Sequence, residues 1–459
     1  MNRREFLKIS ALTTTSLLIK ACTRIPLDVP DLNLTPTHPT PVPESTDFFN
    51  LHPFIETHPE AVFIKSTQVA IKTDWKAKLR EGMEVAREIF VFETKKGISI
   101  APKIAIKANV TYTYGVGNTL EGMGIVTDKF FMEGLLNGMK SLGFQPGNMH
   151  LHEGNWLKDS KYASDLPYTG YIEIGERTGI QLLNFPSGRK ITELSLEHLE
   201  KDTEILWKDC PQGVVFRRIG YMAPYNQENT WLLNVAKFKA HRMGMSLSVK
   251  NLQGMCVTPY VHFCEGLEKT LKHPEHILDD FQPNFGEHIA ELHSQHQKAG
   301  IPRWDRPGID WNSGYGMEMW AQRTCDSLSI TKVGLSIVEG IYGRNGDGFL
   351  KGPGTGGKAE DFMTNILLFG KDSFRVDIIA TWLAGHEPEN FGLFHIAQER
   401  GLTSEVDPRK IPVFHWGNGN PKPASLTELE RTPLKTPYLC RDYLGQNESP
   451  YHMVDEDFQ

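Results

Sequence analysis

The sequence predicts an α/β fold: a mainly parallel sheet flanked by helices, followed by an irregular C-terminal extension. Three observations support this prediction. Two segments each read as a strand followed by an amphipathic helix, further strand-like runs and a polar helix lie between them, and the 459-residue chain is long enough for one elaborated α/β domain. Such alternation of strands and helices is typical of a parallel sheet with helices on its faces.

The first strand-and-helix unit lies in residues 103–153. Residues 103–110 alternate polar and apolar side chains, as a strand does. Asp128 is placed to cap a helix, which has an apolar face and ends at Gly143. The apolar face consists of Phe131, Leu135, Leu136 and Met139. After the turn at 146–147, residues 149–153 alternate again and predict a second strand.

The second unit lies in residues 364–401. Residues 364–370 read as a strand, Ser373 as a helix cap, and residues 376–383 as a helix that stops at Gly385. Pro388 can begin a further helix that ends at Gly401. Between the two units we predict strands at 213–217, 231–238 and 328–339, and a polar helix at 280–300.

The N-terminus reads as an export signal. Arg3 and Arg4 precede a short apolar run that ends at Cys22, and adjacent arginines in this position are typical of the twin-arginine route. Cys22 resembles the lipidated cysteine of a lipoprotein, although Lys20 departs from that pattern. We therefore expect an exported protein, in the periplasm or at the outer cell surface, whose partners include the twin-arginine translocation machinery and whose membrane contact is an N-terminal lipid.

These features divide the chain into four parts. Residues 1–22 form the signal peptide, and the Pro- and Thr-rich residues 23–46 form a tether that cannot bury a core. Residues 47–402 form the α/β body, and residues 403–459 form the irregular extension. No stretch after Ile19 approaches the roughly 18–20 apolar residues of a membrane helix.

The charge and the cysteines of the chain argue against nucleic-acid binding and against cysteine-ligated metal sites. The chain has 49 Lys and Arg against 56 Asp and Glu, a net charge of −7, which argues against a nucleic-acid partner. Five cysteines follow Cys22, and no two of them form a C-x-x-C pair. Neither a zinc knuckle nor an iron–sulfur ligand run is present, and the odd number leaves at least one thiol unpaired, whichever disulfides form.

Polar residues gather where predicted strands end. Lys107 and Asn109 end the first strand, and two further groups end or follow the 231–238 strand: first Asn234, Lys237, Lys239 and His241, then Lys250, Asn251 and Gly254. In open α/β sheets ligands bind at the carboxyl ends of the strands. Lysines and amides converging there would bind a carboxylate or phosphate through charge-assisted hydrogen bonds, which predicts a small anionic ligand. The alternative is that each lysine is a solvated strand end.

Five short blocks carry a family resemblance. They are residues 106–109, 237–241, 246–254, 338–348 and 370–377, and in this order and spacing they resemble the signature blocks of domain-of-unknown-function family 362. Members of that family are often exported by the twin-arginine route or fused to ferredoxin-like iron–sulfur modules. This chain lacks the ferredoxin cysteines, so an iron–sulfur cluster is not expected.

Carboxylates near strand ends suggest further chemistry. Glu339, Asp347, Asp372, Asp377 and His386 can be combined into a hard-metal site or an acid/base pair. We assign His241, Glu339 and Asp377 as catalytic, and Asp347 and Asp372 as ligands of a divalent metal. For Asp372 the alternative is helix capping. The lysines and amides of the three strand-end groups are assigned to the substrate: Lys107, Asn109, Lys237, Lys239, Lys250 and Asn251.

Two other motifs have weaker support. Residues 352–358 match the first part of a phosphate-binding loop, but Ala359 replaces the Ser or Thr that holds Mg²⁺, and a strand rather than a helix follows. Seven glycines in residues 343–357 instead favour a mobile loop over a site, or a plain surface loop. Histidines 288, 293 and 296 lie on the polar helix, for which a solvent-facing role is the better interpretation. His150 and His152 share one face of a strand, either toward a ligand or half exposed.

Three functional hypotheses follow. The first is an exported enzyme that acts on a small anionic substrate, with the lysines binding the anion and His241 or a carboxylate moving a proton. The second is a non-catalytic protein that binds a ligand at the cell surface. The third is an accessory or scaffold protein whose lipid tether matters most.

Overall fold

The computed structural model describes residues 48–93, 98–99, 103–111, 120–153, 169–182, 205–256, 278–310, 313–347, 349–352 and 354–436. All of them belong to one compact unit, residues 45–459. The predicted signal peptide and tether, with Arg3, Arg4 and Cys22, lie outside the described residues. No described helix has the length and apolar character needed to cross a bilayer.

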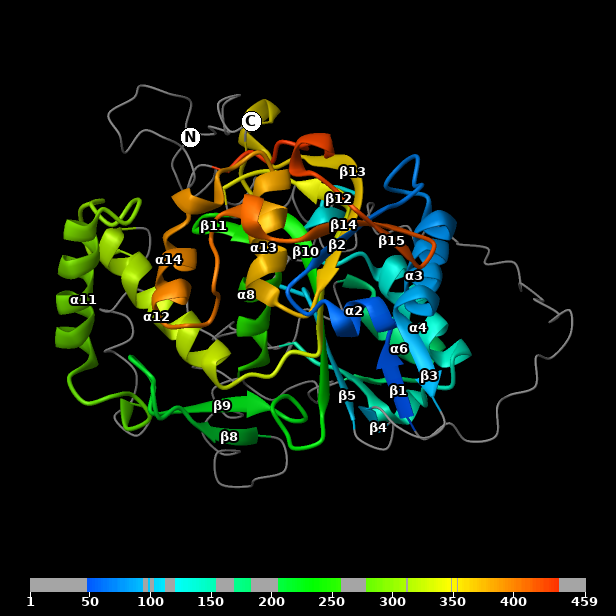
Figure 1. The fold of residues 1–459 in the computed structure, drawn as a ribbon, viewed down its shortest axis with the longest axis horizontal. Helices are drawn as coiled ribbons and strands as arrows, with labels where there is room; N and C mark the ends of the chain where they lie inside the picture. Colours follow the sequence, from blue (N-terminus) through cyan, green and yellow to red (C-terminus); the bar gives the residue numbers. More distant parts are fainter. Residues whose placement is uncertain are drawn as a thin grey trace, which may run out of the picture. The chain divides into compact units, whose positions relative to one another are not determined.

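A ten-stranded mixed sheet forms the centre of this unit (Figure 1). Its order is β15 (Asn420–Pro423), β14 (Val413–Gly417), β2 (Val62–Ser66), β13 (Asp361–Gly370), β12 (Leu335–Arg344), β10 (Trp231–His241), β5 (Ile104–Ala108), β6 (Met149–Leu151) and β7 (Gln181–Leu182), with β11 (Gly244–Ser246) paired to β10. Strands β12, β10, β5, β6 and β7 run parallel, as do β14 and β2. Among the described strands of this sheet, β13, β15 and β11 run the other way. The predicted mainly parallel α/β sheet is confirmed.

Helices cover both faces of the sheet (Figure 1). On one face lie α3 (Trp75–Ile89), α4 (Lys129–Ser141) and α6 (Tyr171–Thr178), and on the other α8 (Ser248–Asn251), α12 (Gly314–Ser329), α13 (Ser373–Leu383) and α14 (Gly392–Glu399). Helix α11 (Phe285–Ala299) packs against α12. Each face of the sheet packs on its helices through a hydrophobic core, and β10 contributes to both because its side chains alternate. Leu233 and Val235 lie in the core beside α3 and α4, whereas Leu232 and Ala236 lie in the core beside α12 and α13.

Smaller elements complete the unit. Strands β1 (Phe48–Leu51), β3 (Phe90–Glu93) and β4 (Ile98–Ser99) form a three-stranded sheet, and β8 (Ile205–Asp209) pairs with β9 (Arg218–Met222). Helix α2 (Pro53–Thr57) follows β1. Short 3-10 turns include η1 (Met123–Ile125), η4 (Leu252–Met255) and η5 (Thr355–Gly357), and the last of these leads into β13, so a strand follows the glycine-rich segment as predicted.

Both predicted strand-and-helix units are present. Asp128 caps α4, because its carboxylate accepts the backbone N–H groups of Phe130 and Phe131 at 2.9 and 3.0 Å. In the second unit the cap is Asp372 rather than Ser373, with its carboxylate 2.9 Å from the N–H of Phe374. The capping alternative for Asp372 is therefore confirmed, and the helix begins at Ser373, one residue earlier than a Ser373 cap would place it.

Three predicted elements differ in the structure. Residues 213–217 are not a strand, because the N–H groups of Val214, Val215 and Phe216 donate to the buried carboxylate of Asp326 instead of to a neighbouring strand. The predicted strand 328–339 begins only at Leu335, since its first residues end α12. Within the extension that we expected to be irregular, β14 and β15 are regular and lengthen the sheet at its edge.

The predicted polar helix 280–300 begins at Phe285 as α11 and is not simply solvent-facing. His296 is 6% exposed, and its two ring nitrogens lie 2.7 Å from carboxylate oxygens of Glu318 on α12 and Glu399 on α14. His293 contacts the carbonyl oxygen of Trp304. His293 and His296 thus join α11 to neighbouring parts of the protein.

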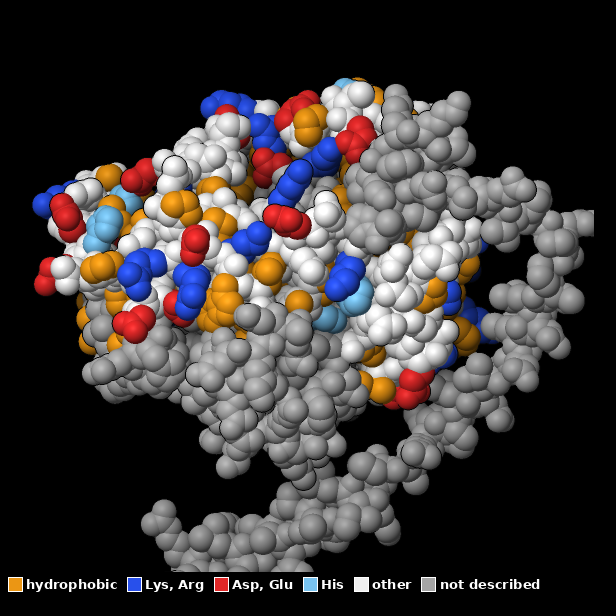
Figure 2. Space-filling model, turned by 90° about the horizontal axis from the view of Figure 1, so that it is seen from below, with side chains coloured by type: hydrophobic (Ala, Val, Ile, Leu, Met, Phe, Trp, Pro, Cys, Tyr) orange, Lys and Arg blue, Asp and Glu red, His pale blue; other side chains and the backbone are white. Residues whose placement is uncertain are grey.

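The described cysteines and the surface add two observations. Cys210, Cys256 and Cys325 are buried free thiols, which confirms that unpaired cysteines are present. The face shown in Figure 2 interleaves Lys and Arg with Asp and Glu over its described part.

Candidate functional site

The crossover connections that follow β5 and β10 lead to opposite edges of the sheet. From β5 the chain passes through α4 on one face to β6, whereas from β10 it passes through α12 on the opposite face to β12, on the other side of β10. Strands β5 and β10 are neighbours, so this is a topological switch point. Open α/β sheets bind ligands outside the carboxyl ends of the strands at such a point.

Lys239 and Asn109 meet at the switch point. Asn109 directly follows β5, and the side-chain amine of Lys239, near the end of β10, lies 3.0 Å from its Oδ1. The amine also donates to the carbonyl oxygen of Ile125 and lies 4.1 Å from the centre of the Phe349 ring. Lys239 is fully buried, and this burial, with the charges of Lys250 and Arg344, holds its pKa well below the ordinary value.

His241 ends β10 on the same side of the strand as Lys239. Its Nδ1 accepts the backbone N–H of Met243 at 3.1 Å, so the neutral ring carries its proton on Nε2. Burial, followed by the charges of Lys250, Lys239 and Arg242, lowers the pKa of His241 well below its ordinary value. The neutral imidazole is thus favoured, with an N–H group that can donate.

Lys250 adds a second amine at this end of the sheet. It lies in α8, half-buried, with its amine 3.3 Å from Oε1 of Gln253 and 6.0 Å from the centre of the Trp320 ring. The indole N–H of Trp320 is buried and has no hydrogen-bond acceptor in the described part of the chain. A buried donor without an acceptor, close to a cation, is a feature that a bound anion would satisfy.

Lys107 belongs to a separate, fully paired network. Its amine lies 2.6 Å from Oε2 of Glu153 and 3.1 Å from Oδ1 of Asn251. Asn251 in turn donates to the backbone oxygen of Lys107 at 2.9 Å and to Asn234 at 2.7 Å. A Cβ on Gly254 would lie 2.1 Å from Glu153, so glycine lets this turn approach the ion pair. Lys107 and Asn251 therefore hold the strand ends together, and Glu153 is the partner that the sequence prediction missed.

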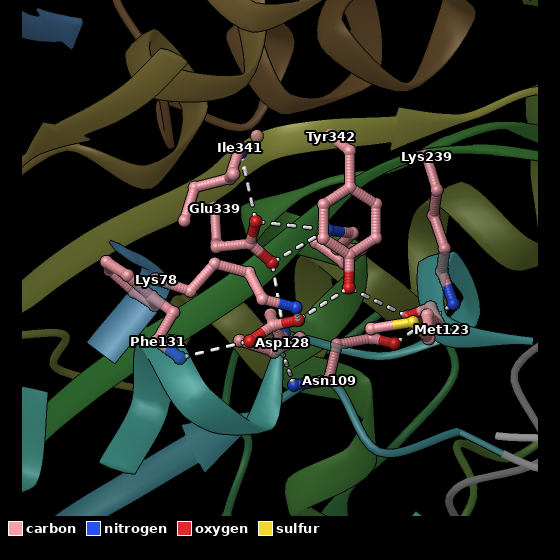
Figure 3. A network of polar contacts seen from close by, with 12 residues as sticks. Lys78, Asn109, Met123, Asp128, Phe131, Lys239, Glu339, Ile341 and Tyr342 are labelled. Carbon is pink, nitrogen blue, oxygen red and sulfur yellow. Dashed lines mark hydrogen bonds and ion pairs between the residues drawn. The ribbon is translucent and has the colours of Figure 1, made fainter. Parts of the chain in front are cut away.

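Glu339 lies within a second buried network (Figure 3), in which Lys237 is its ion-pair partner. Both side chains are fully buried, with the amine 2.8 and 3.0 Å from the two carboxylate oxygens. The carboxylate also accepts the N–H groups of Asp128 and Ile341, both at 3.0 Å. Each oxygen of Glu339 thus has two donors, which leaves no free acceptor for a proton-transfer role.

The same network continues to α3 and to the end of β12 (Figure 3). The carboxylate of Asp128 lies 2.5 Å from the amine of Lys78 and 2.6 Å from the hydroxyl of Tyr342. Burial raises the pKa of Asp128, but the charge and hydrogen bond of Lys78 outweigh burial and lower it overall. Lys78 and Tyr342 were not predicted, because only the tertiary structure brings α3 to this point.

The predicted catalytic Asp377 has a structural position. Its two carboxylate oxygens accept the N–H groups of Ser248 and Val249, both at 2.7 Å, so it caps the short helix α8 that carries Lys250. Burial raises the pKa of Asp377 well above its ordinary value. Asp377 positions α8 and is not placed to contact a substrate.

The two predicted metal ligands lie apart. Asp372 follows the end of β13, which pairs with the start of β12, whereas Asp347 follows the end of β12. These two ends of β12 are eight residues apart, which is roughly 26 Å at about 3.3 Å per residue. Asp347 and Asp372 therefore cannot bind one metal ion together. Asp347 pairs with Arg242 at 2.6 Å, and the described residues contain no cluster of three or more potential metal ligands.

The family comparison matches this part of the molecule. Residues 104–382 match the family model for the Domain of unknown function (DUF362), which covers more than half of the chain. The chain belongs to the DUF362 family. The DUF362 region contains β5, β10, β12 and α8, and with them Asn109, Lys239, His241 and Lys250. Strands β2, β14 and β15 lie outside it and extend the sheet at one edge. Comparisons with curated proteins and with solved structures gave no match.

Proposed function

We propose that this DUF362 protein is an enzyme that acts on a small anionic substrate, a carboxylate or a phosphate, at the carboxyl ends of β5 and β10. The observation that carries the proposal is the excess of basic groups at the switch point. The charge of Lys250 lowers the pKa of both Lys239 and His241, so these basic groups lie close together. No carboxylate lies within ion-pair distance of Lys239 in the described ranges. An anion would offset this excess.

The side chains have different roles in this proposal. The charge of Lys250 and the free N–H of Trp320 bind the anionic group of the substrate. His241, as a neutral imidazole with its proton on Nε2, donates to the reacting oxygen and transfers a proton. Lys107, Lys237, Glu339 and Asp377 shape the site through their networks and do not contact the substrate.

Anion binding tests the proposal. Inorganic phosphate and acetate are titrated separately into the purified full chain by calorimetry. We expect at least one of them to bind, and Lys250→Met to weaken its binding about tenfold or more, because a charge-assisted hydrogen bond contributes about 1.5–3 kcal/mol. Lys358→Met removes an exposed lysine and is the matched control, with unchanged affinity. The proposal fails if neither anion binds, or if both lysine variants bind as the parent does.

We also infer that the protein is exported by the twin-arginine route and anchored through a lipid on Cys22. The inference rests on the arrangement of Arg3, Arg4, the apolar run and Cys22 in the sequence. A body that folds before export suits this route, which carries folded proteins.

A further inference from the structure

The buried lysines of this site fall into two kinds. Three of them contact carboxylates: Lys78 with Asp128 at 2.5 Å, Lys107 with Glu153 at 2.6 Å, and Lys237 with Glu339 at 2.8 Å. Such pairs offset the cost of burying an ammonium group. Lys239 is buried to the same degree, yet within the described residues its partners are two neutral oxygens and an aromatic ring.

This environment favours an uncharged amine. Removing an ammonium group from water without a carboxylate costs several kcal/mol, and proteins avoid this cost by releasing the proton. Lys250, Arg344 and Lys237 add positive charge around Lys239, and the charge of Glu153 opposes them only in part. A desolvated lysine next to other cationic groups is the arrangement in which an amine becomes a nucleophile at neutral pH.

We propose that Lys239 is a catalytic residue whose amine forms an imine with a carbonyl group of the substrate. The proposal rests on the proposed function and narrows its substrate class to small carboxylates or phosphates that also carry an aldehyde or ketone. Lys250 binds the anionic end, and Lys239 meets the carbonyl carbon at the end of β10.

The step balances without a further reactant. The lone pair of Nζ of Lys239 forms a bond to the carbonyl carbon, and the π electrons of the carbonyl move to its oxygen. That oxygen receives the Nε2 proton of His241, while the same ring nitrogen takes one proton from the attacking nitrogen. The hydroxyl group then leaves the carbon as hydroxide, and the nitrogen loses its second proton. The two combine as water, and the C=N bond remains. One carbonyl and one amine thus give one imine and one water.

Phe349 controls access to the amine. Its ring lies over the amine of Lys239 at 4.1 Å and beside the His241 ring at 6.2 Å. Phe349 has a φ of 54°, a left-handed conformation that is uncommon for a bulky residue and is found where the surrounding structure imposes it. Because the ring covers the amine on this side, we expect a substrate to displace Phe349 before it reaches Lys239.

Reductive trapping tests the proposal in the full chain. The protein is incubated at neutral pH with pyridoxal 5′-phosphate or with pyruvate, each carrying a carbonyl and an anionic group, and then reduced with borohydride. Peptide mass spectrometry locates the stable secondary amine. We expect the Lys239 peptide to be labelled about tenfold or more faster than the exposed Lys358 peptide, since each unit of lowered pKa increases the uncharged fraction about tenfold. Phe349→Ala should speed the labelling of Lys239.

The mapping on the parent protein needs no variant, so a misfolded Lys239→Met chain would not prevent the test. Labelling spread over exposed lysines, or found on Lys250 in place of Lys239, overturns the proposal. The two proposals fail separately. Phosphate or acetate binding that depends on Lys250, without an adduct on Lys239, refutes the imine and leaves the anion site. Absence of both refutes the proposed function as well.

Discussion

Single residues in this protein act through the partners that surround them. Lys237 and Lys239 lie two positions apart on β10 and share a side of the strand, yet one contacts a carboxylate and the other does not. The difference arises from β12, which brings Glu339 opposite Lys237, whereas the chain opposite Lys239 supplies Arg344. Their chemistry therefore differs although their residue type and burial are the same.

His296 gives a pH prediction at this scale. Burial lowers its pKa, but the hydrogen bond and charge of Glu318 and the charge of Glu399 outweigh burial and raise it overall. A group whose pKa is higher in the folded state stabilises the fold fully below its unfolded pKa, about 6.5, and loses this contribution as pH rises through the folded pKa. We expect His296→Gln to cost about 1–2 kcal/mol of unfolding free energy at pH 6, mainly through Glu318, because Glu399 is half exposed and screened.

Urea unfolding between pH 6 and pH 9 measures this effect. The difference between the parent and His296→Gln should shrink as the pH rises, because the parent loses its protonated histidine. His288→Gln, which changes an exposed histidine on the same helix, is the matched control. A difference that stays constant or grows with pH would contradict the assignment.

At the scale of elements, close backbone contacts decide how helices pack. Helices α3 and α4 approach through glycines, and a Cβ on Gly134 would lie 2.0 Å from the backbone oxygen of Leu79. A Cβ on Gly82 would lie 2.1 Å from the backbone oxygen of Phe131. Glycine is unfavourable within a helix, so its presence at these positions reflects the approach of the two helices. This approach brings Lys78 of α3 to the N-terminus of α4, where Asp128 lies.

Gly134→Ala should therefore destabilise the protein by about 3 kcal/mol, because the backbones must separate and the gain in helix propensity is at most about 1 kcal/mol. Gly147→Ala is the matched control, since its Cβ would meet no atom within 4 Å, and it should change stability by about 0.5 kcal/mol or less. Chemical denaturation measures both variants. Equal stability of Gly134→Ala and the parent would show that α3 and α4 do not pack as closely as described.

At the scale of the whole molecule, the sheet combines the DUF362 region with strands from both sides of it in the sequence. Strand β2 precedes the region and pairs with β13, and β14 follows the region and pairs with β2. The C-terminal part thus completes one edge of the sheet. After β14 and β15, the C-terminal part also contacts the candidate site, because the hydroxyl of Thr436 donates to the backbone oxygen of His241 at 3.1 Å.

Export is the prediction that belongs to this scale. Replacing Arg3 and Arg4 with lysine should leave the precursor in the cytoplasm, because the route depends on the paired arginines. Cys22→Ser should release the mature protein from the membrane fraction. Fractionation and the intact mass of the mature chain measure both effects. A mature protein that keeps residues 1–22 would refute the signal, and one that begins elsewhere than Cys22 would refute the lipid anchor.

The local order of residues was enough to predict much of this molecule. Apolar alternation located β5, β10 and β13, the cap and stop residues located α4 and α13, and polar strand ends located Asn109, Lys239 and His241. These signals are local, since a strand, a cap or a turn depends on residues within a few positions. The resemblance to the DUF362 family depended on the same short blocks and is confirmed.

Only the tertiary structure decided how these residues are used. Glu339 and Asp377 accept hydrogen bonds from distant segments, and Asp347 and Asp372 lie at opposite ends of the sheet. Among the five buried lysines of the described residues, Lys239 alone has no carboxylate partner there. The physical reason is that a buried charge takes its chemistry from its partners, and those partners come from strands and helices far apart in the sequence. The sequence therefore placed these polar residues at strand ends, whereas packing distinguished the structural pairs from the reactive amine that we propose.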